Sequence, residues 1–253
     1  MSRSKENFRK KSKSPFLINK KSFFGVMEII LSEIKNMFFA SFDKKMTKEN
    51  KVLNYVLSEA TKDNPDSVLN VIDSCGYNNF FLMNIGDKKG KILDEYVLKS
   101  DAKCLLELGV YLGYSTIRIA RNLSEDAHLY SIDVNEEFLN IAKQHLDFSG
   151  LTKKVSFYNG KASEVIPQLD QKFDFVFIDH WKEAYLQDLK ILIEHDRLND
   201  GAIIFADNIV LFHLEEYLDF VRTSPNFSSE FIPALREYSS SHPDGIEVSH
   251  FKK

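Results

Sequence analysis

The sequence predicts an α/β fold whose central sheet is doubly wound and mostly parallel, with an antiparallel edge at its C-terminal end. Three observations predict it. From residue 103 onward, short apolar runs that suit buried strands alternate with segments of helical spacing, as in a parallel sheet with crossover helices. A glycine turn joins the first of these strands to the first helix. After Asn208 this rhythm changes, and two β-like runs favour antiparallel strands at one sheet edge.

The expected elements follow in chain order. Before the sheet, helices are expected at 51–60 and 68–72, and a loop at 83–90 precedes a third helix at 91–98. The expected strands lie near 103–108, 127–132, 154–158, 173–178 and 202–206. The helices between them are expected near 114–123, 136–148, 162–169 and 182–195. A last helix near 213–223 precedes the β-like runs at 227–232 and 245–251.

The stretch from Leu105 to Ser115 carries the clearest functional signal, because a buried strand runs into a turn with two glycines and then into a helix. Gly109 and Gly113 permit backbone angles and close approaches that a side chain would block. A strand, a glycine turn and a helix N-terminus together form a cradle for a nucleotide, although a tight turn without a ligand has the same pattern. Asp133 ends the next predicted strand, where an acid would accept hydrogen bonds from ribose hydroxyls.

One domain with an extension is expected, with the extension at 1–47, a basic tail and an amphipathic helix, and the domain at 48–253. Residues 1–21 carry eight Lys or Arg and one Glu, a net charge of +7, whereas the whole chain carries −4. Residues 23–42 have apolar side chains on one broad face at helical spacing, which indicates an amphipathic helix. This helix could dock on its own domain or on a second copy, lie on a membrane surface, or belong to an organelle-targeting peptide.

Composition limits the partners and the compartment. The body outside the basic tail is acidic, which argues against nucleic acid as the main partner. The two cysteines, Cys75 and Cys104, form no disulfide framework and have no metal-ligand spacing. A reducing, cytoplasmic location is therefore expected, with peripheral membrane contact through residues 1–42 as a further possibility.

Polar side chains follow two later strands of the predicted sheet. Asp179 comes directly after the strand near 173–178, and Asp207 and Asn208 follow the strand near 202–206. In open α/β sheets, ligands bind beyond the carboxyl ends of the strands, so these side chains are expected to meet at one edge. They offer only oxygen ligands, which suits a hard cation such as Mg²⁺. The alternative is that each side chain caps a helix or lies in a solvated loop.

Three further side chains follow Asp179. Lys182 lies three residues later and can reach the same cleft, where desolvation beside a divalent cation would favour its neutral form and make it a usable base. The alternative is an ordinary lysine facing solvent at a helix start. His180 and Trp181 would place planar side chains at the mouth of a ligand site, although either could simply pack.

The motifs in these stretches resemble those of the catechol O-methyltransferase family, from about residue 50 to 251 and in the family's order. The Asp179-to-Lys182 run is the most specific of them, because related methyltransferases that act on caffeoyl-CoA or tRNA generally lack it. The matching stretches are 83–90, 107–109 with 113–115, 179–182 and 206–208.

The resemblance implies a Rossmann-like methyltransferase sheet, S-adenosylmethionine and magnesium as cofactors, and a small catechol-like substrate. Lys182 would be the general base, and Asp179, Asp207 and Asn208 the magnesium ligands. Substrate contacts would come from Lys182, Asn208, Glu237 and Trp181. The implied cofactor-binding residues are Ile85, Glu107, Gly109, Tyr111, Ser115, Asp133, Ser163, Asp179 and His180.

The chain departs from the family's pattern at several substrate and adenine contacts. Glu237 matches the acid that binds the second catechol hydroxyl only after a one-residue shift, since an ungapped match places Tyr238 there. A one-residue slip reverses a side chain's direction in a strand. The other departures are Phe81 for a tryptophan, Ala162-Ser163 for a Ser-Gln pair, Ala184 for an arginine, Phe212 for a proline and Arg236 for a leucine.

Two competing functions share parts of this pattern. A catalytically silent S-adenosylmethionine-fold binding module, tethered by residues 1–42, would have no need of Asp179, Lys182, Asp207 and Asn208 together. A nicotinamide-dependent dehydrogenase would share the glycine turn and Asp133, but the acids at the later strand ends would remain unexplained.

Deletion of residues 1–42 tests whether the extension sets location rather than chemistry. The truncated protein should keep its turnover and bind more weakly to anionic vesicles, because its tail of charge +7 is gone. Vesicle sedimentation and a turnover assay on both forms measure this. Equal vesicle binding would contradict the membrane hypothesis, and lost turnover in a folded truncation would show that the extension helps to build the site.

Overall fold

The computed structural model describes residues 46–212 and 214–253. The basic tail and the predicted helix at 23–42 lie outside the described residues. Among the described residues, no helix has the length and apolar character needed to cross a membrane.

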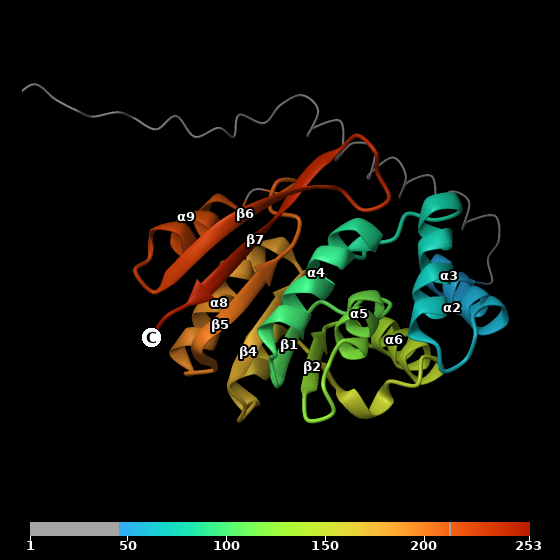
Figure 1. Cartoon of the computed structure of the whole chain (residues 1–253), viewed down its shortest axis with the longest axis horizontal. Helices are drawn as coiled ribbons and strands as arrows, with labels where there is room; N and C mark the ends of the chain where they lie inside the picture. The colour runs from blue at the N-terminus through green and yellow to red at the C-terminus, as the bar shows by residue number, and fades with distance from the viewer. Residues whose placement is uncertain (1–45, 213) are drawn as a thin grey trace, which may run out of the picture.

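One mixed sheet of seven strands runs through the described chain, in the order β3-β2-β1-β4-β5-β7-β6 (Figure 1). The first five strands are parallel, whereas β7 pairs antiparallel with both β5 and β6. This confirms the predicted parallel sheet and its antiparallel C-terminal edge. The strands are β1 (Cys104–Leu108), β2 (His128–Asp133), β3 (Val155–Asn159), β4 (Phe173–Ile178), β5 (Leu198–Ala206), β6 (Phe227–Leu235) and β7 (Pro243–Phe251).

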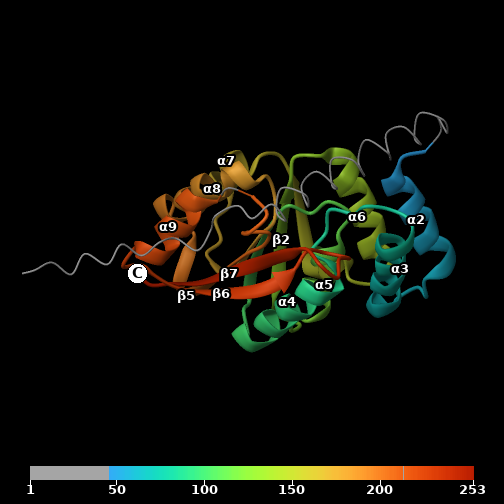
Figure 2. The same ribbon diagram turned by 90° about the horizontal axis from the view of Figure 1, so that it is seen from above.

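Helices cover both faces of the sheet (Figure 2). Side chains alternate along a strand, so Leu105 packs in the core under α2 to α6 and its neighbour Leu106 in the core under α7 to α9. The helices are α2 (Lys48–Glu59), α3 (Pro65–Asn78), α4 (Gly86–Ser100), α5 (Tyr114–Arg121), α6 (Glu136–Phe148), α7 (Ala162–Val165), α8 (Tyr185–Glu194) and α9 (Glu215–Thr223). Short 3₁₀ turns are η1 (Thr152–Lys154), η2 (Ile166–Gln168) and η3 (Lys182–Ala184).

The prediction of a loop at 83–90 was wrong at its C-terminal end, because α4 begins at Gly86. Glycines disfavour a helix by propensity, but Gly90 leaves room for Arg118, because a Cβ there would lie 2.5 Å from Arg118 Nε and would force that side chain to move. The helices predicted at 162–169 and 182–195 are each divided between a 3₁₀ turn and an α-helix. Pro167 lies in the first of these turns, consistent with its missing N–H donor.

The turn after β1 brings two backbone segments into close contact. Gly109 has φ +96°, and a Cβ on it would lie 2.8 Å from the carbonyl carbon of Asp179 and from the nitrogen of His180. Glycine is therefore needed here both for its backbone angle and for the lack of a side chain. Gly201 has a similar φ of +82° but no atom within 4 Å of such a Cβ.

The pair Gly109→Ala and Gly201→Ala separates these two effects. Positive φ should cost each variant about 1–2 kcal/mol of unfolding free energy. Gly109→Ala should lose a further 1–3 kcal/mol or so, because the new methyl group meets backbone that cannot rotate away. Denaturant unfolding of both variants measures the difference, and equal losses would show that the close approach carries no cost.

Candidate active site

A cleft of about 470 Å³ opens at the carboxyl ends of β1, β2, β4 and β5. Side chains from loops far apart in the sequence line it, as expected for the ligand-binding edge of a doubly wound sheet. The predicted site residues that line it are Gly109, Tyr111, Ser115, Asp133, Asp179, His180, Trp181, Lys182, Asn208 and Glu237. Of the described residues, the predicted site residues outside this lining are Ile85, Glu107, Ser163 and Asp207.

Three of those four residues lie beneath the cleft, since Ile85, Glu107 and Asp207 are completely buried. Ser163 is partly buried at the start of α7, and its neighbour Ala162 contributes to the cleft wall instead. The structure thus brings the predicted residues together as one site, with Ser163 at its margin.

Asp133 holds the glycine turn from the neighbouring strand. Its Oδ2 accepts hydrogen bonds from the backbone nitrogens of Val110 and Tyr111, at 2.9 and 3.0 Å, and its Oδ1 accepts one from Asn135 at 2.8 Å. The carboxylate therefore shapes the turn as well as facing the cleft.

Glu107 supplies a buried acidic group under the same turn. Its carboxylate accepts hydrogen bonds from the hydroxyls of Ser115, Thr116 and Ser131, at 2.6 to 2.7 Å. Burial raises the pKa of Glu107 to about 7, and the three hydroxyl donors oppose that rise. A cationic group bound in the cleft above would favour the ionised carboxylate.

His180 lines the cleft, and its backbone nitrogen lies next to Gly109 of the turn. Its ring stacks on Tyr185 with centroids 5.3 Å apart, and its Nε2 lies 2.6 Å from Oδ2 of the buried Asp188. The ring is thus held in one orientation from two sides, so it offers a fixed planar surface at the cleft.

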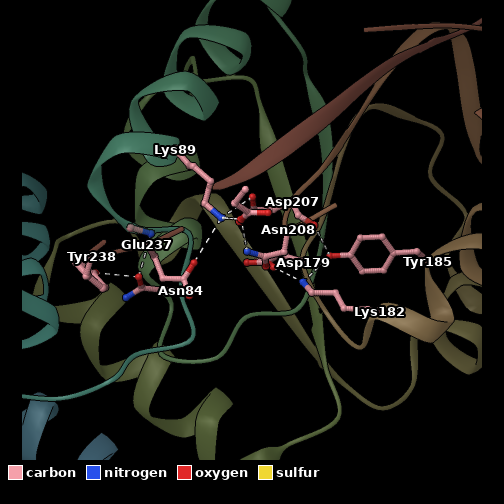
Figure 3. Close-up of polar contacts among 11 residues, drawn as sticks. Asn84, Lys89, Asp179, Lys182, Tyr185, Asp207, Asn208, Glu237 and Tyr238 are labelled. Atoms are coloured by element: carbon pink, nitrogen blue, oxygen red, sulfur yellow. Dashed lines mark hydrogen bonds and ion pairs between the residues drawn. The ribbon is translucent and has the colours of Figure 1, made fainter. Parts of the chain in front are cut away.

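Sheet register brings the two later strand ends together. Ile178 of β4 pairs with Ala206 of β5, so that Asp179 and Asp207 follow in neighbouring positions (Figure 3). Asn208 has φ +57°, a left-handed conformation that asparagine tolerates better than most residues.

Asp207 and Asn208 each keep an oxygen available. Asp207 Oδ1 pairs with Lys89 Nζ at 2.8 Å, whereas its buried Oδ2 has no hydrogen-bond partner among the described residues. Asn208 donates Nδ2 to Asp244 at 3.0 Å, which leaves its carbonyl oxygen for another contact. Burial raises the pKa of Asp207 to about 8, opposed by Lys89 and supported by the nearby Asp179.

Lys182 reaches the same strand ends from η3. Its Nζ donates to Asp179 Oδ1 and to the hydroxyl of Tyr185, both at 2.7 Å, and Tyr185 donates to the backbone carbonyl of Asp207 at 3.2 Å. The ammonium also lies 5.8 Å from the ring centre of Phe212. Lys182 therefore lies between the acids and the aromatic rim of the cleft.

Glu237 and Tyr238, the two residues that could match the family's acid for the second hydroxyl, direct their side chains to different places. Glu237 lines the cleft, and its Oε2 lies 3.5 Å from Lys89. Tyr238 instead directs its hydroxyl to Asn84 and Asp73, at 2.9 and 3.0 Å. Of the two, the structure places Glu237 at the cleft, as the shifted match expects.

Sequence reasoning missed Lys89 and Asp244. Lys89 is 1% exposed, and its Nζ lies 2.7 Å from Asp244 Oδ2 as well as against Asp207. One signal could have found it: Lys89 shares a helical stripe with Gly86, Leu93 and Val97, so it occupies a core position of α4. Tyr185 was missed as well, although it follows Lys182 by three residues and is completely buried.

Glu107→Gln should remove one source of pH-dependent stability. Burial raises the pKa of Glu107 to about 7 in the folded protein, from an ordinary value of 4.5 for a free side chain. The free energy of unfolding should therefore fall as the pH rises between these values, by roughly 3 kcal/mol at most. Glu107→Gln should flatten this fall, and Glu137→Gln, an exposed acid on α6, should retain it. Unfolding at several pH values without ligand measures both, and parallel profiles would contradict the prediction.

Comparison with known proteins identifies the family. A family model described as O-methyltransferase matches residues 58–215. The catechol O-methyltransferase of Bos taurus is 35% identical over 230 residues, which cover 89% of this chain and 82% of that protein. The catechol O-methyltransferase of Mus musculus is 36% identical over 233 residues, covering 90% and 86%.

Solved structures share the fold at lower identity. An O-methyltransferase from Bacillus cereus, in complex with SAH, has a TM-score of 0.64 at 19% identity and covers 87% of this chain and 97% of its own. The O-methyltransferase TomG from Streptomyces achromogenes, in complex with SAM, has a TM-score of 0.64 at 20% identity, covering 86% and 96%. The resemblance in the sequence is thus confirmed: the chain belongs to the O-methyltransferase family, is similar to its catechol O-methyltransferases, and is an S-adenosylmethionine-dependent methyltransferase.

Proposed function

We propose that this enzyme moves a methyl group from S-adenosylmethionine to one hydroxyl of a catechol, or of a similar small vicinal diol, that is chelated to Mg²⁺. The single observation that carries the proposal is that two groups of residues, one suited to the cofactor and one suited to a cation, line the same cleft. The glycine turn with Asp133 forms one half, and Asp179, Lys182 and Asn208 form the other.

The first half suits the cofactor. We assign the ribose hydroxyls to Asp133 and the adenine to the wall formed by His180, with Ser163 at the margin. Glu107 and Gly109 would lie by the methionine part, where the buried carboxylate favours a cationic group. Ile85, Tyr111 and Ser115 complete the assigned cofactor contacts.

The second half suits a hard cation. Among the described residues, no group of three or more His, Cys, Asp or Glu side chains could hold a metal ion, so the assigned set relies on an amide. Asp179 and Asp207 supply carboxylates and Asn208 supplies a carbonyl oxygen. The unpartnered buried Oδ2 of Asp207 is the observation that supports a cation here. Two carboxylates with further sites left to substrate and water are typical of Mg²⁺.

Lys182 would perform the proton transfer. When bound, the cation would lower the pKa of the diol hydroxyls and S-adenosylmethionine would supply the methyl carbon. In its neutral form, Lys182 Nζ takes the proton from one hydroxyl. S-adenosylmethionine, held by Asp133, His180 and Glu107, would supply the methyl carbon to that oxygen and would keep the electron pair of the carbon–sulfur bond on its sulfur, and Lys182 would hold the proton. Glu237 would accept a hydrogen bond from the second hydroxyl.

Apolar side chains at the rim would hold the flat substrate ring. Trp181 is 73% exposed, Met83 50% and Phe212 41%, and all three line the cleft together with Phe81. Exposed side chains of this size are unfavourable in water, so a planar aromatic ligand is their natural occupant. Residues 1–42 are assigned to location and not to chemistry, on the basis of the basic tail at 1–21 and the amphipathic pattern at 23–42.

Methyl transfer from labelled S-adenosylmethionine to a panel of catechols tests the proposal, with single-hydroxyl phenols as control substrates. Activity should need both hydroxyls, vanish with excess chelator and return with Mg²⁺. Lys182→Met should lower kcat by on the order of 10²–10⁴-fold while cofactor affinity changes little. Lys190→Met, on the exposed side of α8, is the matched control and should behave as the unmodified enzyme.

Two results would contradict different parts of the proposal, the metal ion and the base. Full activity in excess chelator would show that methyl transfer needs no metal ion, and the enzyme would then be a metal-independent methyltransferase. A near-normal kcat in Lys182→Met, with Lys190→Met also normal, would assign the proton transfer to another group.

A further inference from the structure

A buried lysine joins the residues assigned to the cation and to the substrate. Lys89 extends from α4 toward the carboxyl end of β5, with Glu237 to one side and Asp207 and Asn208 to the other (Figure 3). Its Nζ lies 2.7 Å from Asp244 Oδ2, 2.8 Å from Asp207 Oδ1 and 3.5 Å from Glu237 Oε2. The side chains of Lys89, Asp207 and Asp244 are fully buried, so water does not replace these contacts.

Each acid that contacts Lys89 has one carboxylate oxygen held by the ammonium. Asp207 has one oxygen on the ammonium and one without a hydrogen-bond partner, so it can offer a single oxygen elsewhere. Asp244 uses Oδ2 for both Lys89 and the amide of Asn208, at 2.7 and 3.0 Å, and its Oδ1 is buried without a hydrogen-bond partner among the described residues. Burial opposes its charge, but the Lys89 ammonium and the Asn208 amide together hold the pKa of Asp244 below its usual range.

The charges of the cluster show what Lys89 prevents. Four carboxylates lie at this end of the sheet, those of Asp179, Asp207, Glu237 and Asp244, and two ammonium groups, Lys89 and Lys182, contact them. In their ionised forms they leave a surplus of two negative charges, which one divalent cation neutralises. Without Lys89 the surplus would be three, and three of the acids would lose a partner.

We propose that Lys89 is a positioning residue that keeps Asp244, Glu237 and one oxygen of Asp207 away from the bound cation. This inference rests on the proposed function. Without Lys89, the carboxylates of Asp207, Glu237 and Asp244 would be free to turn toward the cation and to fill coordination positions that the substrate needs. A cation limited to Asp179, one oxygen of Asp207 and Asn208 keeps positions open for the two oxygens of a substrate. The ammonium thereby also favours Mg²⁺ over Ca²⁺, since Ca²⁺ takes more oxygen ligands in a flexible arrangement.

Lys89→Met tests this inference by cation binding instead of turnover. Titration calorimetry of the full chain with Mg²⁺ and with Ca²⁺, without substrate, gives the ratio of the two affinities. The variant should raise Ca²⁺ affinity relative to Mg²⁺ by about tenfold or more, because released carboxylates add ligands and charge. Lys91→Met removes an exposed lysine from the same helix and should leave the ratio unchanged.

Folding is checked separately, because loss of Lys89 leaves buried acids without a counter-charge. Lys89→Gln retains polar contacts and is the second variant, with the same direction of change expected. Circular dichroism and thermal melting identify which variants are folded. The unmodified protein gives a measurement that needs no variant: it should not bind Ca²⁺ more tightly than Mg²⁺.

The possible results distinguish this inference from the proposed function. If the unmodified protein binds neither cation, with or without S-adenosylmethionine, the magnesium part of the proposed function is wrong and the inference fails with it. If it binds Mg²⁺ but a folded Lys89 variant keeps the same affinity ratio, only the role of Lys89 is overturned. Tighter binding of Ca²⁺ than of Mg²⁺ by the unmodified protein would also overturn that role.

Discussion

The site depends on one topological constraint: the chain turns in opposite directions after β1 and after β4. These two parallel strands are neighbours, but the crossover after β1 leads to β2 on one side and the crossover after β4 leads to β5 on the other. The loops that leave them must diverge, and the cleft lies between them. Below it, the backbone at Gly109 touches that of Asp179 and His180, which closes the floor and fixes how the two halves face each other.

The two halves stabilise buried negative charge in different ways. Glu107 has three hydroxyl donors and no ammonium within hydrogen-bond range among the described residues, so its ionised form depends on what binds above it. Asp207 has the ammonium of Lys89 and a second oxygen without a hydrogen-bond partner. Removing one partner of a buried ion pair is costly, because the other partner is left as an unpaired buried charge. The pair between Lys89 and Asp207 therefore holds α4 against the edge of the sheet. The half assigned to the cofactor therefore holds its buried acid with neutral hydroxyl donors, whereas the half assigned to the cation holds its acids with ammonium groups.

Much of this arrangement follows from local sequence. Short apolar runs and the glycine turn predict the parallel strands, and the rule for their carboxyl ends brings Asp133, Asp179 and Asn208 to one edge without any knowledge of side chains. The early start of α4 and the ion pairs of Lys89 could not be predicted in this way, although the helical stripe that Lys89 shares with core residues is a local signal of its burial. Lys89 and Asp244 are 155 positions apart, and only the completed sheet brings them together. The direction of Glu237 likewise depends on the turn between β6 and β7, where a shift of one residue exchanges it with Tyr238.

The departures from the family pattern lie mostly on the rim and spare the buried cluster, and this separation has a physical basis. Of these departures, Phe81 and Phe212 line the cleft from two separate loops and are partly or largely exposed, so a change in one requires little repacking. Lys89, Asp207 and Asp244 share one set of ion pairs, so a change in one leaves the others as unpaired buried charges. A substitution at the rim can therefore change the proposed substrate contacts without breaking the ion pairs of the buried cluster. Lys182 is where the two regions meet, since its ammonium contacts Asp179 and also lies 5.8 Å from the ring centre of Phe212. A large aromatic residue at position 212 thus bears both on the shape of the substrate slot and on the position of the proposed base.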